Sequence, residues 1–582
     1  MADKQDLIFV GSYLLERLAQ LGVNSLFGVP GDFNLGFLDL VEDHPDIDWV
    51  GNCNELNAAY AADGYARVKQ KSIGALLTTF GVGELSAING IAGAFSEMVP
   101  IIHIAGVPST SQQKNKPMLH HTLGDGRYDA YYKAAQQFAS SHTGLMDLST
   151  ATSEIDRVLT DCITNARPVY LMLPTDIVYQ KVSSAPLKTP LKPSPPETEA
   201  EVEEFVLNEI QKLVEEAGED VVILVDACAI RHGVKEEAWD LIEKSGFPVY
   251  AAPMGKSAVP EGYERYGGIY VGSLSHPDVK AKVEGAKLIL SVGSLKSDFN
   301  TGNFTYRIPQ ASTVELHSDH TRIQYALYPG VGFKKLLPKL TARLHPLDHP
   351  ASSVTVPPFR ALLPNPAEDP LGADVISHLW LWPRMGEFFE PEDVVVSETG
   401  TSSFGALAVP LPKDAIYVSQ ILWGSIGWTL GSTLGAALAA REIGLKGRTI
   451  LFVGDGSLQL TVQELSTMMR KGLKPIVFVL NNSGYTIERH LHGRVRHYND
   501  IVNWKWTKLL EVMAPEDIKV PPKSYTVHTK SELDALLKEE SFAHAEGMQL
   551  VELMMDKFDA PVALLKQAEL SGKTNKYVAD FV

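Results

Sequence analysis

Residues 449–457 have the sequence Thr-Ile-Leu-Phe-Val-Gly-Asp-Gly-Ser, and residues 475–488 have the sequence Pro-Ile-Val-Phe-Val-Leu-Asn-Asn-Ser-Gly-Tyr-Thr-Ile-Glu. Each segment begins with an apolar run and then passes into a polar loop that contains glycine. This pattern predicts two buried parallel strands whose carboxyl ends meet at one edge of a sheet. Because open parallel sheets bind ligands at that edge, the two loops are the first candidate site.

Short apolar runs of the same kind recur along the chain, and longer segments of mixed polarity separate them. Such alternation is typical of parallel strands joined by crossover helices. We therefore expect an α/β fold with three doubly wound parallel-sheet domains. The other expected strands lie at residues 25–28, 73–80, 99–105, 168–174, 221–226, 248–252, 288–292 and 393–399.

Two stretches with little periodicity divide the chain. Residues 180–200 are rich in Pro, Ser and Lys, and residues 345–370 contain clustered prolines. Both compositions suit exposed connections. A short tail at the carboxyl end is expected either to cover a site entrance or to be disordered. The expected divisions are domains over residues 1–185, 200–345 and 370–565, and the tail over residues 566–582.

The composition is that of a large globular protein. The 582 residues are 45% apolar and 21% charged, and Gly and Pro are too few for a low-complexity chain. The formal net charge of −18 argues against nucleic acid or an anionic membrane surface as the main partner. No apolar run approaches the roughly 20 residues of a membrane-spanning helix.

Cysteine usage and the first residues predict a cytoplasmic protein. Cys53, Cys162 and Cys228 are the three cysteines, and no Cys-x-x-Cys pair is present. Neither a disulfide framework nor a structural zinc site is therefore expected. The chain starts Met-Ala-Asp-Lys-Gln-Asp, which lacks the basic and apolar segments of a secretory signal.

The two loops at the predicted sheet edge offer the chemistry of a metal and anion site. Asp455 and Asn482 supply the hard oxygen ligands that Mg²⁺ prefers. The glycines on either side of Asp455, together with Gly484, let backbone amides approach an anion, and a helix expected near Ser457 presents its positive end there. Either fragment alone is an ordinary turn after a buried strand. The pair, at a spacing of 27 residues, predicts a clamp for Mg²⁺ and a diphosphate.

This pair of loops resembles the cofactor-binding motif of thiamine-diphosphate enzymes. The resemblance implies that Asp455, Asn482 and the carbonyl of Gly484 hold Mg²⁺, and that thiamine diphosphate is the cofactor. By the same resemblance, the first expected domain binds the pyrimidine ring, the second is the central domain of the family, and the third binds the diphosphate.

Glu55 begins the segment Glu-Leu-Asn-Ala-Ala-Tyr-Ala-Ala-Asp-Gly-Tyr-Ala-Arg, whose apolar spacing predicts an amphipathic helix. A lone glutamate at a helix start is more often a stabiliser of the helix than a catalyst. The segment nevertheless resembles the part of thiamine enzymes whose glutamate hydrogen-bonds the pyrimidine ring of the cofactor. By that resemblance, Glu55 promotes formation of the reactive thiamine-diphosphate ylid.

His120 and His121 lie in Met-Leu-His-His-Thr-Leu-Gly, and Asp32 lies in Gly-Asp-Phe-Asn. From these residues alone, surface histidines without a role and a functional pair are equally good interpretations, and adjacent histidines rarely bind one metal ion. Asp32 by itself is ordinary turn chemistry. Together with the Glu55 segment and the Gly-Tyr-Thr-Ile-Glu that ends at Glu488, these motifs resemble pyruvate decarboxylases, the fungal ones above all. The matches extend over almost the whole chain.

The resemblance implies a role for each matching residue. Four catalytic side chains, Asp32, His120, His121 and Glu488, would surround the substrate, which Asp32, His121 and Glu488 contact. Of these, Asp32 and Glu488 would transfer protons. Ile426 would wedge the two cofactor rings into a bent conformer. The full set expected to bind the cofactor is Glu55, Thr401, Gly424, Ser425, Ile426, Asp455, Gly456, Ser457, Asn482, Ser483, Gly484, Tyr485, Thr486 and Ile487.

The implied reaction is the non-oxidative decarboxylation of pyruvate to acetaldehyde and carbon dioxide, as in alcoholic fermentation. Phe299, Thr399, Phe404 and Ile487 match the pyruvate-sized pocket of the family, where bulk limits the substituent on the keto carbon. The alternative within the class is an aromatic or branched 2-oxo-acid decarboxylase acting on phenylpyruvate or indolepyruvate. The alternative from another class is a non-catalytic binding protein that has kept the fold.

The family also implies an assembly in which the first domain of one subunit and the third of another enclose each cofactor. A homo-oligomer is therefore expected. It would be at least a dimer, and the expected homotetramer would be a dimer of dimers. Cys228 matches a cysteine linked to substrate activation in the yeast enzymes, but Met98 stands where those enzymes have a relay histidine. This departure favours the commoner role of a free cysteine, a small buried residue.

Overall fold

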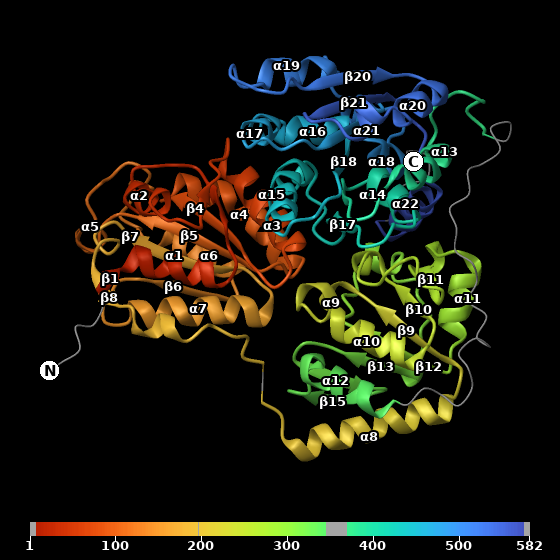
Figure 1. Cartoon of the computed structure of the whole chain (residues 1–582), viewed down its shortest axis with the longest axis horizontal. Helices are drawn as coiled ribbons and strands as arrows, with labels where there is room; N and C mark the ends of the chain where they lie inside the picture. Colours follow the sequence, from red (N-terminus) through yellow and green to blue (C-terminus); the bar gives the residue numbers. More distant parts are fainter. Residues whose placement is uncertain (1–6, 196, 345–368, 576–582) are drawn as a thin grey trace.

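The computed structural model describes residues 7–195, 197–344 and 369–575, which form three α/β units (Figure 1). Each unit is built on one large sheet, and the three sheets fall within the three residue ranges expected from the sequence. The α/β fold class is therefore confirmed. The first six residues and residues 345–368 of the expected second connection lie outside the described part of the chain.

The first unit has a parallel sheet of order β3-β2-β4-β5-β7-β6. Its four inner strands are the four expected ones, because burial on both faces makes them mostly apolar, with Ser25, Thr78, Thr79 and His103 as buried polar exceptions. The strands are β2 (Ser25–Gly28), β4 (Gly74–Thr79), β5 (Ile101–Val107) and β7 (Val169–Pro174), with β3 (Asp48–Trp49) and β6 (Ser141–Gly144) at the edges and β1 (Leu7–Phe9) paired with β8 (Lys181–Ser183). The helices are α1 (Val10–Gln20), α2 (Leu35–Glu42), α3 (Glu55–Val68), α4 (Val82–Ser96), α5 (Thr110–Asn115), α6 (Ala130–Ala135) and α7 (Ala151–Asn165).

The central unit has a mixed sheet of order β11-β10-β9-β12-β13-β14-β15, not the purely parallel one that the sequence suggested. Strand β14 runs antiparallel to both β13 and β15, because tight turns join these three consecutive strands. The strands are β9 (Val221–Val225), β10 (Val249–Ala251), β11 (Tyr266–Ile269), β12 (Leu288–Val292), β13 (Thr313–Leu316), β14 (His320–Ile323) and β15 (Ala326–Pro329). The helices are α8 (Ala200–Ala217), α9 (Ala227–Arg231), α10 (Lys235–Ser245), α11 (Pro277–Gly285) and α12 (Phe333–Arg343).

The third unit has a fully parallel sheet of order β17-β16-β18-β19-β21-β20. The strands are β16 (Val394–Ser397), β17 (Ile416–Ser419), β18 (Thr449–Gly454), β19 (Ile476–Asn481), β20 (Lys523–Val527) and β21 (Gln549–Met554). The helices are α13 (His378–Phe388), α14 (Thr401–Ala406), α15 (Trp428–Glu442), α16 (Asp455–Thr461), α17 (Glu464–Arg470), α18 (Thr486–Leu491), α19 (Leu509–Met513), α20 (Lys530–Leu537), α21 (Glu540–Ala543) and α22 (Val562–Thr574).

Helices α3 and α15 join the first and third units within one chain (Figure 1). Small residues let the two backbones approach closely. A Cβ atom added at Gly435 would lie 1.8 Å from the carbonyl oxygen of Ala61, and one added at Gly64 would lie 2.1 Å from that of Ser432. Only glycine fits at these contacts, so the helix that begins at Glu55 has a fixed position against the third unit.

The carboxyl end differs from the expected tail. Helix α22 runs through residue 566, where the tail was placed, and packs against α14 and α18. Leu564, which is fully buried, contacts an apolar cluster that includes Phe404. This burial is why residues 562–574 form a helix of the third unit, and residues 576–582 lie outside the described part. Among the described helices, none combines the length and the apolar character needed to cross a membrane.

Candidate active site at two domain edges

The two loops that follow β18 and β19 lie side by side at the carboxyl edge of the third sheet. Gly454 pairs in register with Leu480, so the residues that follow them are neighbours. Asp455 is fully buried and joins the loops through its carboxylate. Its Oδ1 accepts a hydrogen bond of 2.8 Å from the Gly456 amide, and its Oδ2 accepts one of 3.2 Å from the Gly484 amide.

This edge fits a metal ion and a diphosphate. Burial raises the pKa of Asp455 to about 7, so a cation beside it would stabilise its charged form. Oδ1 of Asn482 is buried and has no hydrogen-bond partner among the described residues, which leaves an amide oxygen free for a ligand. Around Gly454, no atom of another part of the chain lies within 4 Å of an added Cβ, so the backbone there faces open space.

The other cofactor residues predicted in the third unit lie at the same sheet edge, either in loops or in the first turn of the helix that follows. Each loop follows the carboxyl end of a strand, and the strands are neighbours in the order β17-β16-β18-β19. Such an edge collects residues that are far apart in sequence into one crevice. Thr401 follows β16, Gly424, Ser425 and Ile426 follow β17, Gly456 and Ser457 follow β18, and Ser483, Tyr485, Thr486 and Ile487 follow β19.

The loop after β17 is held in place by residues of the first unit. Glu97 is buried, and its Oε1 accepts hydrogen bonds of 3.0, 2.6 and 3.1 Å from the backbone amides of residues 421–423. The hydroxyl groups of Tyr60 and Ser425 are 2.7 Å apart. These contacts set the position of Gly424, which has a φ of +66° that favours glycine. Sequence reasoning assigned neither Glu97 nor Tyr60 to the site.

A second buried carboxylate, Glu398, connects the loops after β16 and β17. It accepts hydrogen bonds from the backbone amides of Thr399 (3.0 Å) and Gly427 (3.1 Å) and from the hydroxyl of Thr429 (2.5 Å). Burial raises the pKa of Glu398 to about 7. Glu398 therefore fixes Thr399, a predicted pocket residue, against the start of α15, and the sequence carried no signal for this role.

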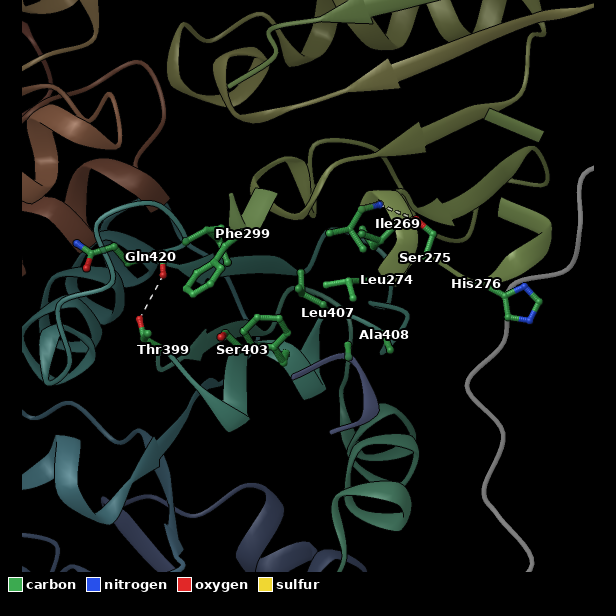
Figure 2. A pocket seen from close by; sticks show the side chains of 14 residues that line it. Ile269, Leu274, Ser275, His276, Phe299, Thr399, Ser403, Leu407, Ala408 and Gln420 are labelled. Carbon is green, nitrogen blue, oxygen red and sulfur yellow. Dashed lines mark hydrogen bonds between the residues drawn. The ribbon is translucent and has the colours of Figure 1, made fainter. Parts of the chain in front are cut away.

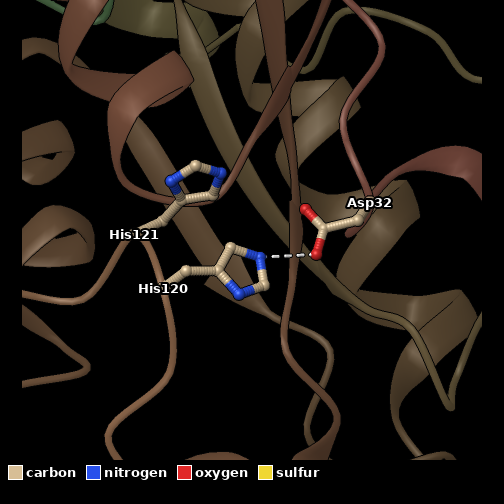
Figure 3. Close-up of side chains that lie close together, drawn as sticks. All are labelled: Asp32, His120 and His121. Carbon is tan, nitrogen blue, oxygen red and sulfur yellow. Dashed lines mark hydrogen bonds and ion pairs between the residues drawn. The ribbon is translucent and has the colours of Figure 1, made fainter.

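The first unit brings Asp32, His120 and His121 together (Figure 3). A hydrogen bond of 2.6 Å joins His120 Nε2 to Asp32 Oδ2, and the ring centroids of the two histidines are 4.7 Å apart. Phe33 stacks on His120 at a centroid distance of 5.2 Å. All three polar side chains are at least partly exposed, so they can meet a ligand. The sequence predicted this cluster from motifs almost 90 residues apart.

The backbone of His121 is held in a left-handed conformation, with φ of +63°. The hydroxyl of Tyr131 donates a hydrogen bond of 2.7 Å to the His121 carbonyl oxygen. Gly81 packs against the same oxygen, and a Cβ atom there would lie 2.4 Å from it. Glu84 in turn accepts a 2.9 Å hydrogen bond from the Gly81 amide. Tyr131 and Gly81 thus hold the backbone of His121 directly, and Glu84 holds Gly81 in place.

Glu55 is the first residue of α3, and the helix start is well fixed. Asn54 caps the helix by accepting a 2.8 Å hydrogen bond from the Asn57 amide. Asn52 and Asn57 each donate a side-chain hydrogen bond to Glu464 of the third unit, at 3.1 and 3.0 Å. Glu55 itself is half-buried. Its side chain is therefore presented at a defined place by a helix that the third unit anchors.

Glu488 lies in α18, where burial raises the pKa of its carboxyl group above the usual value. Within the described residues, no hydrogen bond or ion pair connects Glu488 or Asp455 to Glu55 or to the Asp32 cluster. One chain therefore carries two separate groups of candidate residues, one in the first unit and one in the third.

An apolar cavity of about 100 Å³ lies between the central and third units (Figure 2). It is lined by Phe299, Thr399 and Phe404, three of the four predicted pocket residues. The rings of Phe299 and Phe404 meet edge to face at 5.8 Å. Ile487, the fourth, packs against the same cluster. Sequence reasoning missed the lining residues Leu274 and Ala563, which come from distant segments, the latter from α22.

Three family models match the chain in the order of its three units. The model for the N-terminal TPP binding domain of thiamine pyrophosphate enzymes matches residues 9–130, the central-domain model residues 207–334, and the C-terminal TPP binding domain model residues 398–553. The chain belongs to the thiamine pyrophosphate enzymes. Both groups of candidate residues lie in the two parts of this family described as TPP binding, so thiamine diphosphate is the cofactor that the edge of the third sheet fits.

Curated relatives within the thiamine pyrophosphate enzymes are similar over nearly the full length. Pyruvate decarboxylase isozyme 1 of Saccharomyces cerevisiae is 47% identical over 571 residues, which cover 98% of this chain and 99% of that protein. The pyruvate decarboxylase of Candida glabrata is 47% identical, with the same coverage. That of Aspergillus fumigatus is 47% identical over 97% of both chains. The resemblance to fungal pyruvate decarboxylases expected from the motifs is thus confirmed.

Cys228 is buried, as its sequence context favoured, and burial raises its pKa to about 12. Its Sγ lies 3.3 Å from Sδ of Met98. The thioether of Met98 has no titratable proton, so it cannot act as the relay histidine of the yeast enzymes would.

Proposed function

We propose that this chain catalyses the non-oxidative decarboxylation of pyruvate to acetaldehyde and carbon dioxide. The observation that carries the proposal is the meeting of Asp455 and Asn482 at one sheet edge, in a chain 47% identical over nearly its whole length to proteins named pyruvate decarboxylase. The printed names of these relatives favour pyruvate over phenylpyruvate or indolepyruvate as the substrate.

In this proposal Mg²⁺ is held by Asp455, Asn482 and the carbonyl oxygen of Gly484. The buried carboxylate and the amide oxygen support this assignment. Among the described residues, no cation pairs with Asp455 and no donor reaches Oδ1 of Asn482, and both are ligand types that Mg²⁺ accepts. When bound, thiamine diphosphate supplies a carbon nucleophile and an electron sink for decarboxylation. The protein residues position that group, exclude water and move protons.

Three side chains are assigned to proton transfer, and two to binding or orienting the reactants. Burial lets Glu488 keep its proton to higher pH than an exposed glutamate, so it can donate to an oxygen or carbon of the substrate. The 2.6 Å contact between Asp32 Oδ2 and His120 Nε2 allows a proton to pass between them. His121 orients the substrate beside this pair. Glu55 would bind the pyrimidine ring.

Among the described residues of one chain, no hydrogen bond or ion pair joins Glu55 or the Asp32 cluster to Asp455 or Glu488, which supports an assembly in which the two groups meet between copies. We assign Glu55 and the Asp32 cluster of one subunit to the same site as Asp455 and Glu488 of a second subunit. The molecule would then be at least a dimer. If it forms a homotetramer, the tetramer would be a dimer of dimers. The absence of disulfides among the described residues is compatible with a cytoplasmic enzyme that acts in alcoholic fermentation.

The test removes cofactor and Mg²⁺ from the purified protein, resupplies both, and measures acetaldehyde and carbon dioxide from pyruvate and from phenylpyruvate. We expect activity on pyruvate to return only with both additions. Faster turnover of phenylpyruvate would transfer the assignment to the aromatic alternative. If neither binding nor turnover is detected, the chain is a non-catalytic relative.

Two substitutions separate the roles within the site. Glu488→Gln should retain the cofactor but lower turnover by about 10²–10⁴, while Glu236→Gln, at a side chain that is 81% exposed, should change nothing. Glu55→Ala should abolish proton exchange at the thiazolium carbon of bound cofactor. Normal exchange in that variant would remove Glu55 from its assigned role.

A further inference from the structure

A second cavity lies at the opposite edge of the third sheet from Asp455. It has a volume of about 430 Å³ and is lined by Thr449, Ile476 and Gln549, the first residues of β18, β19 and β21. The candidate cofactor loops follow the last residues of β18 and β19. The length of these strands therefore separates the two sites. The volume falls in the roughly 300–1,000 Å³ range of small-molecule pockets.

The cavity is strongly basic although the chain is acidic overall, with a net charge of −18. Arg441, Lys446, Arg448, Lys474 and His544 line it, and no acidic residue among those described does. In the described part of the chain, the side chains of Arg441, Lys446 and Lys474 form no ion pair. Three positively charged side chains therefore line this cavity, and no carboxylate among the described residues forms an ion pair with them.

The acidic groups nearby are committed to other atoms. Asp393 pairs with Nη2 of Arg448 at 2.6 Å, and Glu390 lies 3.7 Å from Nη1 of Arg448 and 3.6 Å from Nε2 of His544. Glu392 accepts its hydrogen bond from the backbone amide of Lys446, at 2.8 Å. These carboxylates balance Arg448 and His544 and leave the charge of the three free cations in place.

Two buried polar atoms at the cavity have no hydrogen-bond partner in the described part of the chain. They are Nη1 of Arg448, whose side chain is 10% exposed, and Oε1 of Gln549, a residue that is 1% exposed. Nε2 of Gln549 already donates to the carbonyl of Phe542 at 2.6 Å. Buried polar groups normally have partners. One donor and one acceptor are therefore available to a ligand that brings an anionic oxygen and a hydroxyl group.

The remaining wall is apolar and shallow. Ala437, Ala440, Leu445, Leu473 and Ala545 supply it, and none of these side chains can hydrogen-bond. A ligand that fits this lining needs a flat or apolar body in addition to its charge. Free inorganic phosphate would satisfy the cations but would leave this wall and Gln549 Oε1 without contacts.

We propose that this cavity binds a phosphate dianion, carried on a hydroxylated ester with an aromatic or apolar body, such as a nucleoside monophosphate. The phosphate lies among Arg441, Lys446 and Lys474, with Nη1 of Arg448 as a further donor. The guanidinium groups suit phosphate because they present parallel N–H donors. The hydroxyl groups of the ester reach Oε1 of Gln549, and its body covers the apolar wall. The site is independent of the proposed decarboxylase activity.

The test is calorimetric titration of the holoenzyme, saturated with thiamine diphosphate and Mg²⁺, with adenosine monophosphate, inorganic phosphate and adenosine. We expect adenosine monophosphate to bind more tightly than inorganic phosphate, adenosine to bind at least tenfold more weakly, and the affinity to fall as salt is raised. Inorganic phosphate binding as tightly as the monophosphate would identify the free ion as the ligand of the same site.

Variants place the binding in the cavity. Lys446→Ala with Lys474→Ala should weaken adenosine monophosphate at least tenfold without changing decarboxylase turnover. Lys413→Ala, at a side chain of the same unit that is 83% exposed, should have no effect. The proposal is wrong if no binding occurs, if the double variant binds normally, or if excess thiamine diphosphate displaces the ligand.

Discussion

Tyr131→Phe tests how the chain positions His121. The substitution removes the hydroxyl that donates to the His121 carbonyl oxygen at 2.7 Å and leaves the buried ring in place. A hydrogen bond of this kind contributes about 0.5–1.5 kcal/mol, while a left-handed residue costs about 1–2 kcal/mol. The hydrogen bond contributes about as much free energy as the left-handed backbone costs. Loss of the hydrogen bond should therefore let His121 relax out of its φ of +63°. A loss of about 1 kcal/mol corresponds to an about fivefold fall in turnover.

The assay measures kcat and KM for pyruvate decarboxylation, the affinity for thiamine diphosphate and the thermal unfolding midpoint. We expect kcat to fall about fivefold while cofactor affinity is unchanged, because the proposed diphosphate site lies in the third unit, away from His121. Tyr179→Phe is the matched control, since its hydroxyl bonds Asp39 on a partly exposed surface. Unchanged kcat in Tyr131→Phe, or an equal fall in both variants, would refute the positioning role.

Three further results are expected. Burial raises the pKa of Glu84 from 4.5 to about 7, so the free energy of unfolding should fall as pH rises between these values. Glu84→Gln should flatten this pH dependence when unfolding by urea is measured. An unchanged pH dependence in the variant would contradict the raised pKa of Glu84. Asn482→Ala should lose retained thiamine diphosphate and Mg²⁺ on gel filtration; full retention would exclude Asn482 as a ligand. Phe404→Ala should raise the rate on phenylpyruvate relative to pyruvate by enlarging the cavity, and cost about 3–5 kcal/mol of stability; a constant rate ratio would argue against Phe404 limiting substrate size.

Several elements were predictable because their signal is local. The run at residues 288–292 is β12, and the run at residues 25–28 is β2, since strands buried on both faces are apolar at most positions. Strands β14 and β15 have only partial burial and carry no such signal. The end of the chain was misjudged for a related reason. Helix α22 is recognisable as a domain element only through the contact of Leu564 with distant residues.

The motif residues of the two candidate groups were identifiable from the sequence mainly through their joint resemblance to thiamine-diphosphate enzymes, because each motif alone fits an ordinary turn or helix start. Their supports were not identifiable. The hydroxyls of Tyr60 and Ser425 meet although 365 residues separate them, and Glu97 binds the amide of Ile421 across 324 residues. The sequence around each of these residues contains no pattern that indicates its distant partner.

By itself, then, the amino-acid order determined the α/β class and the residue ranges within which the three sheets fall, and it singled out the loops proposed to carry the chemistry, because these follow from short-range polarity and backbone preference. The tertiary structure alone decided which loops share an edge, which buried carboxylates fix them, and where unpaired cations collect at Lys446 and Lys474. These depend on the crossing of α3 and α15 and on strand order, which arise only when the whole chain packs.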